Sequence, residues 1–221
     1  MFLARTVSLC YPQKEEREKD EKKRRMLTTT FDRDEVNALI HILQSLGVSY
    51  LMGTDLSLPE AVEAIDPIHL LQRLAACNYP LVENASIALF LLHPDLASSV
   101  GTALRESEPD LAENLAVVTL ATLYLQQWWF FRLTFALGYL PSFPEEPFTS
   151  LWEDRHLPPP FAGYGQTGLL ALQAYQQQRY GVPLNFLADW QNQIDHLLAQ
   201  EEAHQHQLSA DARNALLRQS A

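Results

Sequence analysis

LAVVTLATLYLQQWWFFRLTFALGYL, residues 115–140, is the most apolar segment of the 221-residue sequence. About 20 apolar residues cross a bilayer, but Gln126, Gln127 and Arg132 interrupt this segment near its middle. An arginine at the centre of a transmembrane helix costs about 2.5–3.5 kcal/mol of insertion free energy. A helix that is apolar on all sides is also typical of the buried centre of a domain. We therefore predict a central hydrophobic helix and no transmembrane span. Its consecutive aromatic residues are expected to pack on different neighbours: Trp128, Trp129, Phe130 and Phe131.

Helix-start signals recur along the rest of the chain. Asp66-Pro67 combines a capping side chain with a first-turn proline. Leu81, Leu96 and Leu111 each follow such a proline, at intervals of 15 residues. Evenly spaced short helices resemble the antiparallel pairs of a HEAT-like stack. We predict an all-α fold around the central helix, either an irregular helical bundle or HEAT-like pairs.

Composition divides the chain into five parts. The predicted parts are a charged, disordered extension (1–25), a helical core (26–140), a long proline-rich and aromatic loop (141–168), C-terminal helices of the same domain (169–207) and a fraying amphipathic tail (208–221). Residues 14–25 read KEEREKDEKKRR and contain no apolar side chain that could offset the entropy of ordering. Two interpretations stay open: a genuine charged arm, or a translated ribosome-binding sequence upstream of a true start at Met26.

Charge and cysteine content narrow the functional classes. The net charge is −11, and every lysine lies within the first 23 residues, so the remaining chain is more acidic than the whole. Phosphate contacts dominate nucleic-acid affinity, so we predict no nucleic-acid binding through this acidic body. Two cysteines, Cys10 and Cys77, do not make a disulfide framework, which favours a cytoplasmic protein. Cys77 is predicted to be a small core residue.

The 141–168 loop is the leading candidate for a binding surface. It holds six of the 13 prolines and is rich in aromatic residues. A loop of this length is commonly functional, and the aromatic residues predict packing either on the domain itself or on a partner. The predicted partner-binding residues are Phe143, Phe148, Trp152, Arg155, Phe161 and Tyr164.

A glycine pattern in this loop resembles a dinucleotide fingerprint. Residues 163–168 read GYGQTG, which matches G-x-G-x-x-G, and Asp189 lies 21 residues beyond Gly168. The fingerprint requires a buried strand that feeds the turn. The preceding residues 157–161 read LPPPF, which excludes a central strand. We therefore predict a loop that enters a helix, with no cofactor.

Two polar clusters are the alternatives for chemistry. Glu202 and His206 share a helix face, as do Glu201 and His204, so the first pair is a weak metal-ligand candidate. A carboxylate-bridged metal site needs such pairs on facing helices, so no metal is predicted. The adjacent residues Asp154-Arg155-His156 form either a local ion network or an unfamiliar catalytic cluster.

The sequence therefore favours a non-enzymatic, cytosolic interaction protein of adaptor or regulatory type, with a protein partner. Two alternatives stay open. One is an enzyme or metal-binding protein with an unfamiliar motif. The other is an acidic operon partner that neutralises a basic, toxin-like protein. A homo-oligomer is compatible with each of them.

Overall fold

A computed structural model describes residues 33–51, 66–77, 79–140 and 142–219, with side chains up to residue 212. Within these ranges the chain folds as helices and turns without a strand, which confirms the all-α prediction. The HEAT-like arrangement stays a prediction. The charged extension, Cys10 and the proposed start at Met26 lie outside the described residues.

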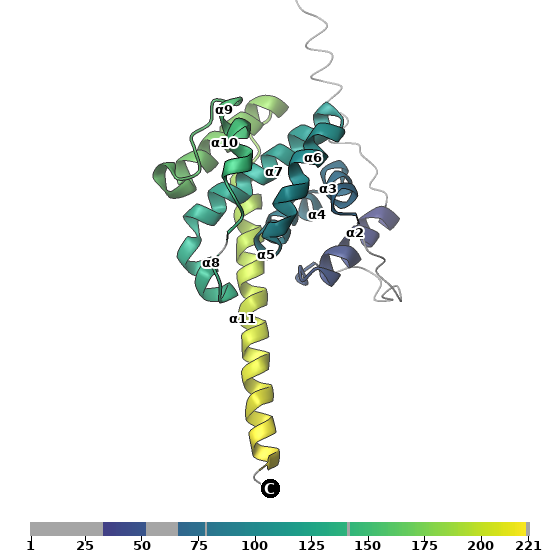
Figure 1. The fold of residues 1–221 in the computed structure, drawn as a ribbon, viewed down its shortest axis with the longest axis vertical. Helices are drawn as coiled ribbons and strands as arrows, with labels where there is room; N and C mark the ends of the chain where they lie inside the picture. Colours follow the sequence, from purple (N-terminus) through teal and green to yellow (C-terminus); the bar gives the residue numbers. More distant parts are fainter. Residues whose placement is uncertain (1–32, 52–65, 78, 141, 220–221) are drawn as a thin grey trace, which may run out of the picture.

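Figure 1 shows the order and arrangement of the helices. In chain order they are α2 (Arg33–Ser45), α3 (Pro67–Ala76), α4 (Pro80–Asn84), α5 (Ser86–Leu92), α6 (Ala97–Glu106), α7 (Pro109–Trp128), α8 (Phe130–Leu137), α9 (Thr149–Glu153), α10 (Gln166–Tyr180) and α11 (Phe186–Gln219). Three short 3₁₀ turns are η1 (Pro94–Leu96), η2 (Glu146–Phe148) and η3 (Ala162–Gly165). The predicted start at Asp66-Pro67 is confirmed, because the Asp66 carboxylate accepts hydrogen bonds from the Ile68 and His69 N–H groups.

Helix α7 is the predicted central helix. Every residue from Leu115 to Gln126 is buried, and α7 contacts α3, α5, α6 and α10. The buried hydroxyls of Thr119 and Thr122 donate to the carbonyls one turn earlier, Leu115 O at 2.7 Å and Val118 O at 2.9 Å. Because these polar groups are satisfied within the helix, α7 carries apolar contacts on all sides at little cost.

The apolar segment does not continue as one buried helix. Trp129 leaves helical geometry (φ −99°, ψ 15°), and α8 begins at Phe130. This helix ends at Leu137, and the next residue, Gly138, has a φ of 72° that suits glycine. Phe131 is 85% exposed on α8, so the prediction that it packs inside is wrong. The break places part of the apolar sequence on the surface of the molecule.

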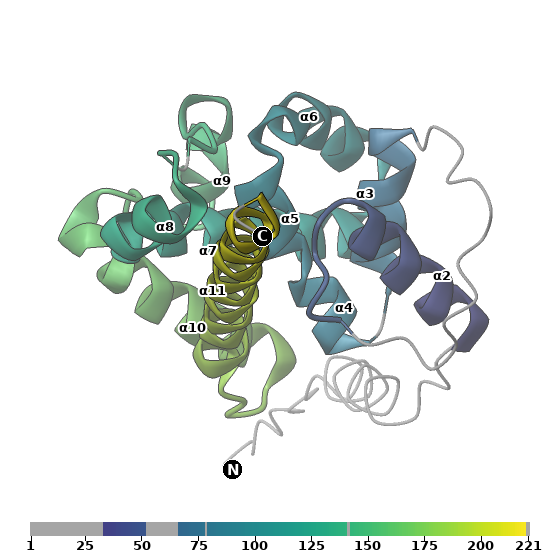
Figure 2. The same cartoon turned by 90° about the horizontal axis from the view of Figure 1, so that it is seen from below.

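Helix α11 closes the core and then leaves it. Trp190, Ile194 and Leu197 are buried and lie on one face of this helix. One helix runs without interruption from Phe186 to Gln219, across the expected boundary at residue 207. The fraying of residues 208–221 stays a prediction. Figure 1 shows its C-terminal half extending away from the other helices, and Figure 2 looks nearly along it from its C-terminal end.

Among the described helices, none is by itself both long and apolar enough to span a membrane. Only α4–α5 together with η1–α6 reach that composition, as a pair bent by 105°.

Candidate functional site

The aromatic segment after α8 packs largely on its own domain. Phe143, Phe148 and Trp152 are buried. The Phe143 ring stacks on Phe90 and on Phe148, with centroid distances of 4.9 and 5.4 Å. Three of the six predicted partner-binding side chains are therefore core residues. Phe161 and Tyr164 remain exposed, at 69% and 83%.

Two glutamines at the end of α7 hold this segment in place. The buried amide of Gln126 accepts from the Phe143 N–H at 2.8 Å and donates to the Phe143 carbonyl at 3.1 Å. The neighbouring Gln127 donates to the Glu145 carboxylate at 2.6 Å. The glutamines that interrupt the apolar sequence thus anchor the chain 17 and 18 residues later.

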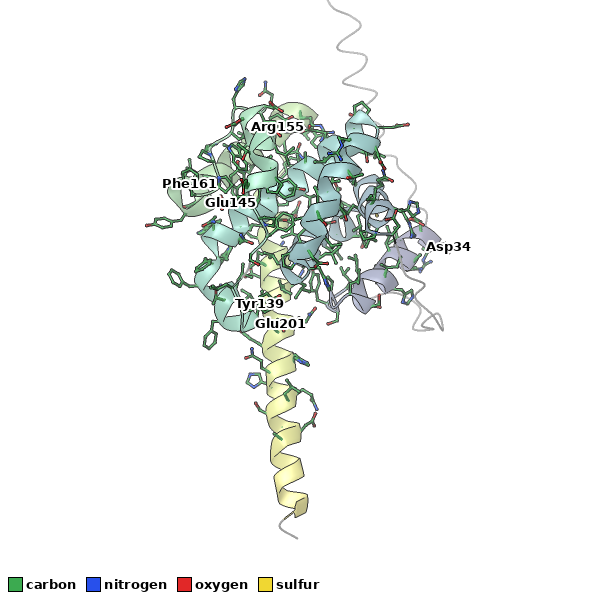
Figure 3. The ribbon with its side chains drawn as sticks, in the orientation of Figure 1. Asp34, Tyr139, Glu145, Arg155, Phe161 and Glu201 are labelled. Carbon is green, nitrogen blue, oxygen red and sulfur yellow. The ribbon has the colours of Figure 1, made fainter. Side chains whose placement is uncertain are left out.

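The anchored segment forms an open groove of about 630 Å³. We call it the acidic groove, and its lining residues are Glu145, Glu146, Thr149, Trp152, Glu153, Leu157, Pro159 and Phe161. Three of them are carboxylates and none is basic, while Trp152, Leu157 and Pro159 are apolar. Figure 3 shows Glu145 and Phe161 close together at the edge of the molecule. The groove combines an apolar surface with a negative charge.

Arg155 does not contribute a positive charge to the acidic groove. Its guanidinium makes a two-point contact with the Glu113 carboxylate on α7, with Nε–Oε1 and Nη2–Oε2 distances of 3.0 and 2.5 Å. Nη1 also donates to the Leu151 carbonyl, and Tyr175 donates its hydroxyl to Glu113 Oε1 at 2.8 Å. Arg155 therefore ties α9 to α7 and α10.

This contact controls the ionisation of both partners. Burial acts to raise the pKa of Glu113, but hydrogen bonds from Arg155 and Tyr175 outweigh it and hold that pKa below its usual range. Burial likewise opposes the charge of Arg155, and the Glu113 contact nevertheless raises the Arg155 pKa. Both groups are charged at neutral pH. Within the predicted Asp154-Arg155-His156 cluster, Asp154 and His156 are instead exposed.

The glycine pattern at 163–168 has a packing role. Gly165 has a φ of 82°, and a Cβ atom there would overlap the backbone carbonyl of Tyr124. A Cβ atom at Gly168 would overlap the Tyr124 ring. The Tyr124 hydroxyl in turn donates to the Pro158 carbonyl at 2.7 Å. The glycines thus let the loop and α10 approach α7 closely, in an all-helical setting without the strand that the fingerprint needs.

The other predicted chemical candidates lie apart from the acidic groove. Glu202 and His206 are exposed on the projecting half of α11, and Glu201 and His204 accompany them on the same helix. Across the part of the chain that the structure describes, no three His, Cys, Asp or Glu residues form a group suited to a metal. Cys77 is buried, and burial raises the pKa of its thiol, which disfavours the reactive thiolate.

A second charged region lies between α4, α7 and α10. Arg179 donates to the Asn114 side-chain oxygen at 3.0 Å, and Asn114 donates to the Ala75 carbonyl. Burial raises the pKa of Glu83 to about 7, although Arg179 opposes this shift. Glu83 therefore changes its charge near neutral pH.

We expect Glu83 to weaken the fold as the pH rises. A carboxyl whose pKa is higher in the folded state stabilises the fold below its unfolded pKa, and this contribution is lost as the pH rises through the folded value near 7. In the wild type, the free energy of unfolding should fall by on the order of 1–3 kcal/mol between about pH 5 and pH 8 because of this carboxyl, and Glu83→Gln should abolish that fall. Urea unfolding of the wild type and the variant at both pH values measures this difference. The exposed-residue control Glu106→Gln should keep the wild-type pH dependence.

No family model matches this chain, and comparisons with curated proteins and with solved structures found no significant match.

Proposed function

We propose that this protein is a non-catalytic interaction module that binds a cationic segment of a partner protein in the acidic groove. The observation that carries the proposal is the composition of this groove, in which three glutamates surround an apolar surface. Its location agrees with the loop that the sequence favours for binding. The cytosolic setting of this function stays a prediction from the sequence.

The charges of the acidic groove support a basic partner. Glu146 and Glu153 are exposed, so their carboxylates are accessible to a second molecule. Arg155, the nearest basic residue in sequence, is engaged by Glu113 on α7. Complementary charges accelerate encounter and select among partners. This chemistry favours the operon-partner alternative, an acidic protein that covers a basic one, over an enzyme.

The apolar lining supports a partner segment that also carries a large apolar side chain. Phe161 forms one wall and is 69% exposed, while the Trp152 ring is largely buried beneath the surface. Aromatic side chains in such positions are the anchors that dominate binding energy at protein interfaces. A partner that inserts an apolar residue between flanking lysines or arginines would satisfy both features.

A synthetic peptide of alternating arginine and leucine tests this proposal. Fluorescence anisotropy should show binding that weakens with salt, because the charges are exposed. The double variant Glu146→Lys/Glu153→Lys should weaken binding at least about tenfold, which corresponds to about 1.4 kcal/mol. Glu145 is left unchanged because it accepts the Gln127 hydrogen bond.

The matched control places the same charge change outside the acidic groove. Glu106 and Glu108 are exposed at the end of α6 and just before α7. The variant Glu106→Lys/Glu108→Lys should bind the peptide almost as tightly as the wild type. Equal weakening by both variants would mean that the peptide responds only to net charge, and the proposal would be wrong.

A further inference from the structure

The projecting half of α11 presents a long surface with no contact to the rest of the described chain beyond its first turns. Residues 202–212 are all exposed, and Leu208 is 55% exposed although it is apolar. Near the body, the Gln205 amide donates a hydrogen bond to the Ala136 carbonyl of α8 at 2.8 Å. Figure 3 shows the helix continuing well beyond Glu201. A helix of such length usually gains its stability from packing.

One side of this projecting half carries a regular pattern. Glu201, His204, Leu208 and Asp211 follow one another at spacings of three, four and three residues, so they share one face. The same spacing continues in the sequence to Ala215 and Arg218. We call these six residues the seam. It runs from an acidic residue near the body, through a central leucine, to a basic residue near the end.

The seam is complementary to itself when reversed. An antiparallel copy centred on Leu208 brings His204 opposite Ala212, next to Asp211. It also brings Glu201 opposite Ala215 and within one turn of Arg218. A parallel copy in register would instead place Glu201 on Glu201 and Asp211 on Asp211, which is unfavourable. Gln207 donates to both Asp211 carboxylate oxygens, at 3.1 and 3.2 Å, and each oxygen keeps a further acceptor position.

An open groove lies at the base of the projecting half, where the C-terminal part of α11 from the antiparallel copy would lie. This base groove has a volume of about 620 Å³ and is lined by Gly47, Ser49, Tyr50, Gln200, Glu201, Ala203 and His204. Its wall is fixed, because the Gln200 amide accepts from the Ser49 N–H at 2.7 Å and donates to the Gly47 carbonyl at 2.7 Å. Pairing about Leu208 brings residues 212–216, with the sequence ARNAL, opposite residues 200–204, which line this groove.

We propose that two copies of this chain associate through antiparallel pairing of the projecting halves of α11, with residues 212–216 of each helix at the base groove of the other copy. Three independent features meet in this arrangement: the exposed leucine at the two-fold axis, the reversed charge order of the seam and the groove at the correct end. Dimers of this kind bring the same patch of each subunit together, as two-fold symmetry requires.

Sedimentation velocity of the full chain tests the proposal. The wild type should sediment as a dimer at about 0.1 mM, and Leu208→Glu should raise the dissociation constant at least about tenfold by placing two carboxylates at the axis. The matched control Leu170→Glu, at a leucine of α10 that is 51% exposed, should remain dimeric. A wild type that is monomeric at about 0.1 mM, or a control that dissociates equally, would overturn the proposal.

Charge reversal tests the orientation. Glu201→Arg and Arg218→Glu should each weaken the dimer, and the double variant should recover most of the loss, since the pair is then restored with opposite signs. Failure of the double variant to recover would refute the antiparallel arrangement. The acidic-groove variant Glu146→Lys/Glu153→Lys should remain dimeric, so that failure of the dimer and failure of peptide binding are distinguishable.

Discussion

Replacing Gly165 with alanine should lower the free energy of unfolding by about 3–5 kcal/mol. Two physical effects add here. The φ of 82° is unfavourable for any residue with a Cβ atom, and that atom would overlap the Tyr124 carbonyl of α7. A backbone carbonyl in a buried helix does not move aside as a flexible side chain would. Urea unfolding monitored by tryptophan fluorescence gives the loss directly.

The control for Gly165 is a glycine with the same backbone conformation and free space around it. Gly181 has a φ of 68° at the end of α10, with no atom within 4 Å of the Cβ position. Gly181→Ala should therefore lose only the conformational part, about 1–2 kcal/mol. If both variants lose the same stability, the close approach to α7 is not what requires glycine at position 165.

The sequence predicted the helical fold well where the determinants are local. The cap at Asp66 and the first-turn prolines at Pro67, Pro80 and Pro109 act within one turn, so they mark helix starts reliably. The burial of residues 115–126 follows from their uninterrupted apolar character. These features need no knowledge of distant contacts.

The fold was less predictable where the determinants are distant in sequence. Phe131 and Leu125 are equally apolar, yet only the break at Trp129 decides that Phe131 faces outward. Gln126 looks like an interruption in an apolar helix until its partner, the Phe143 backbone 17 residues later, is known. Propensity and periodicity contain no information about such pairings.

The candidate site was predicted in part. Trp152 and Phe161 were expected at a binding surface, and both line the acidic groove. The same prediction included Phe143 and Phe148, because the sequence alone does not distinguish a loop aromatic residue that packs in the core from one that is exposed. The three glutamates were missed. Their signal was the occurrence of Glu145, Glu146 and Glu153 among aromatic residues without a neighbouring lysine.

Replacing Arg155 with alanine should lower the free energy of unfolding by about 2–4 kcal/mol. The substitution leaves Glu113 largely buried and without its two-point partner. It also removes the hydrogen bond from Arg155 to the Leu151 carbonyl of α9, and with it the link between α9 and α7. Such a loss is expected because an uncompensated carboxylate in a low-dielectric setting is costly. Arg155→Lys should recover only part of it, since an ammonium does not reproduce the planar two-point contact.

The pH dependence separates this structural role of Arg155 from a role in binding or catalysis. The pKa of Glu113 is lower in the folded protein, so its contribution is present above the unfolded pKa, about 4.3, and is lost as the pH falls through the folded value. Wild type and Arg155→Ala should therefore converge in stability under acid conditions and differ most near pH 7. A difference that stays constant down to about pH 3 would show that the loss comes from packing, and the Glu113 contact would then be incidental to the fold.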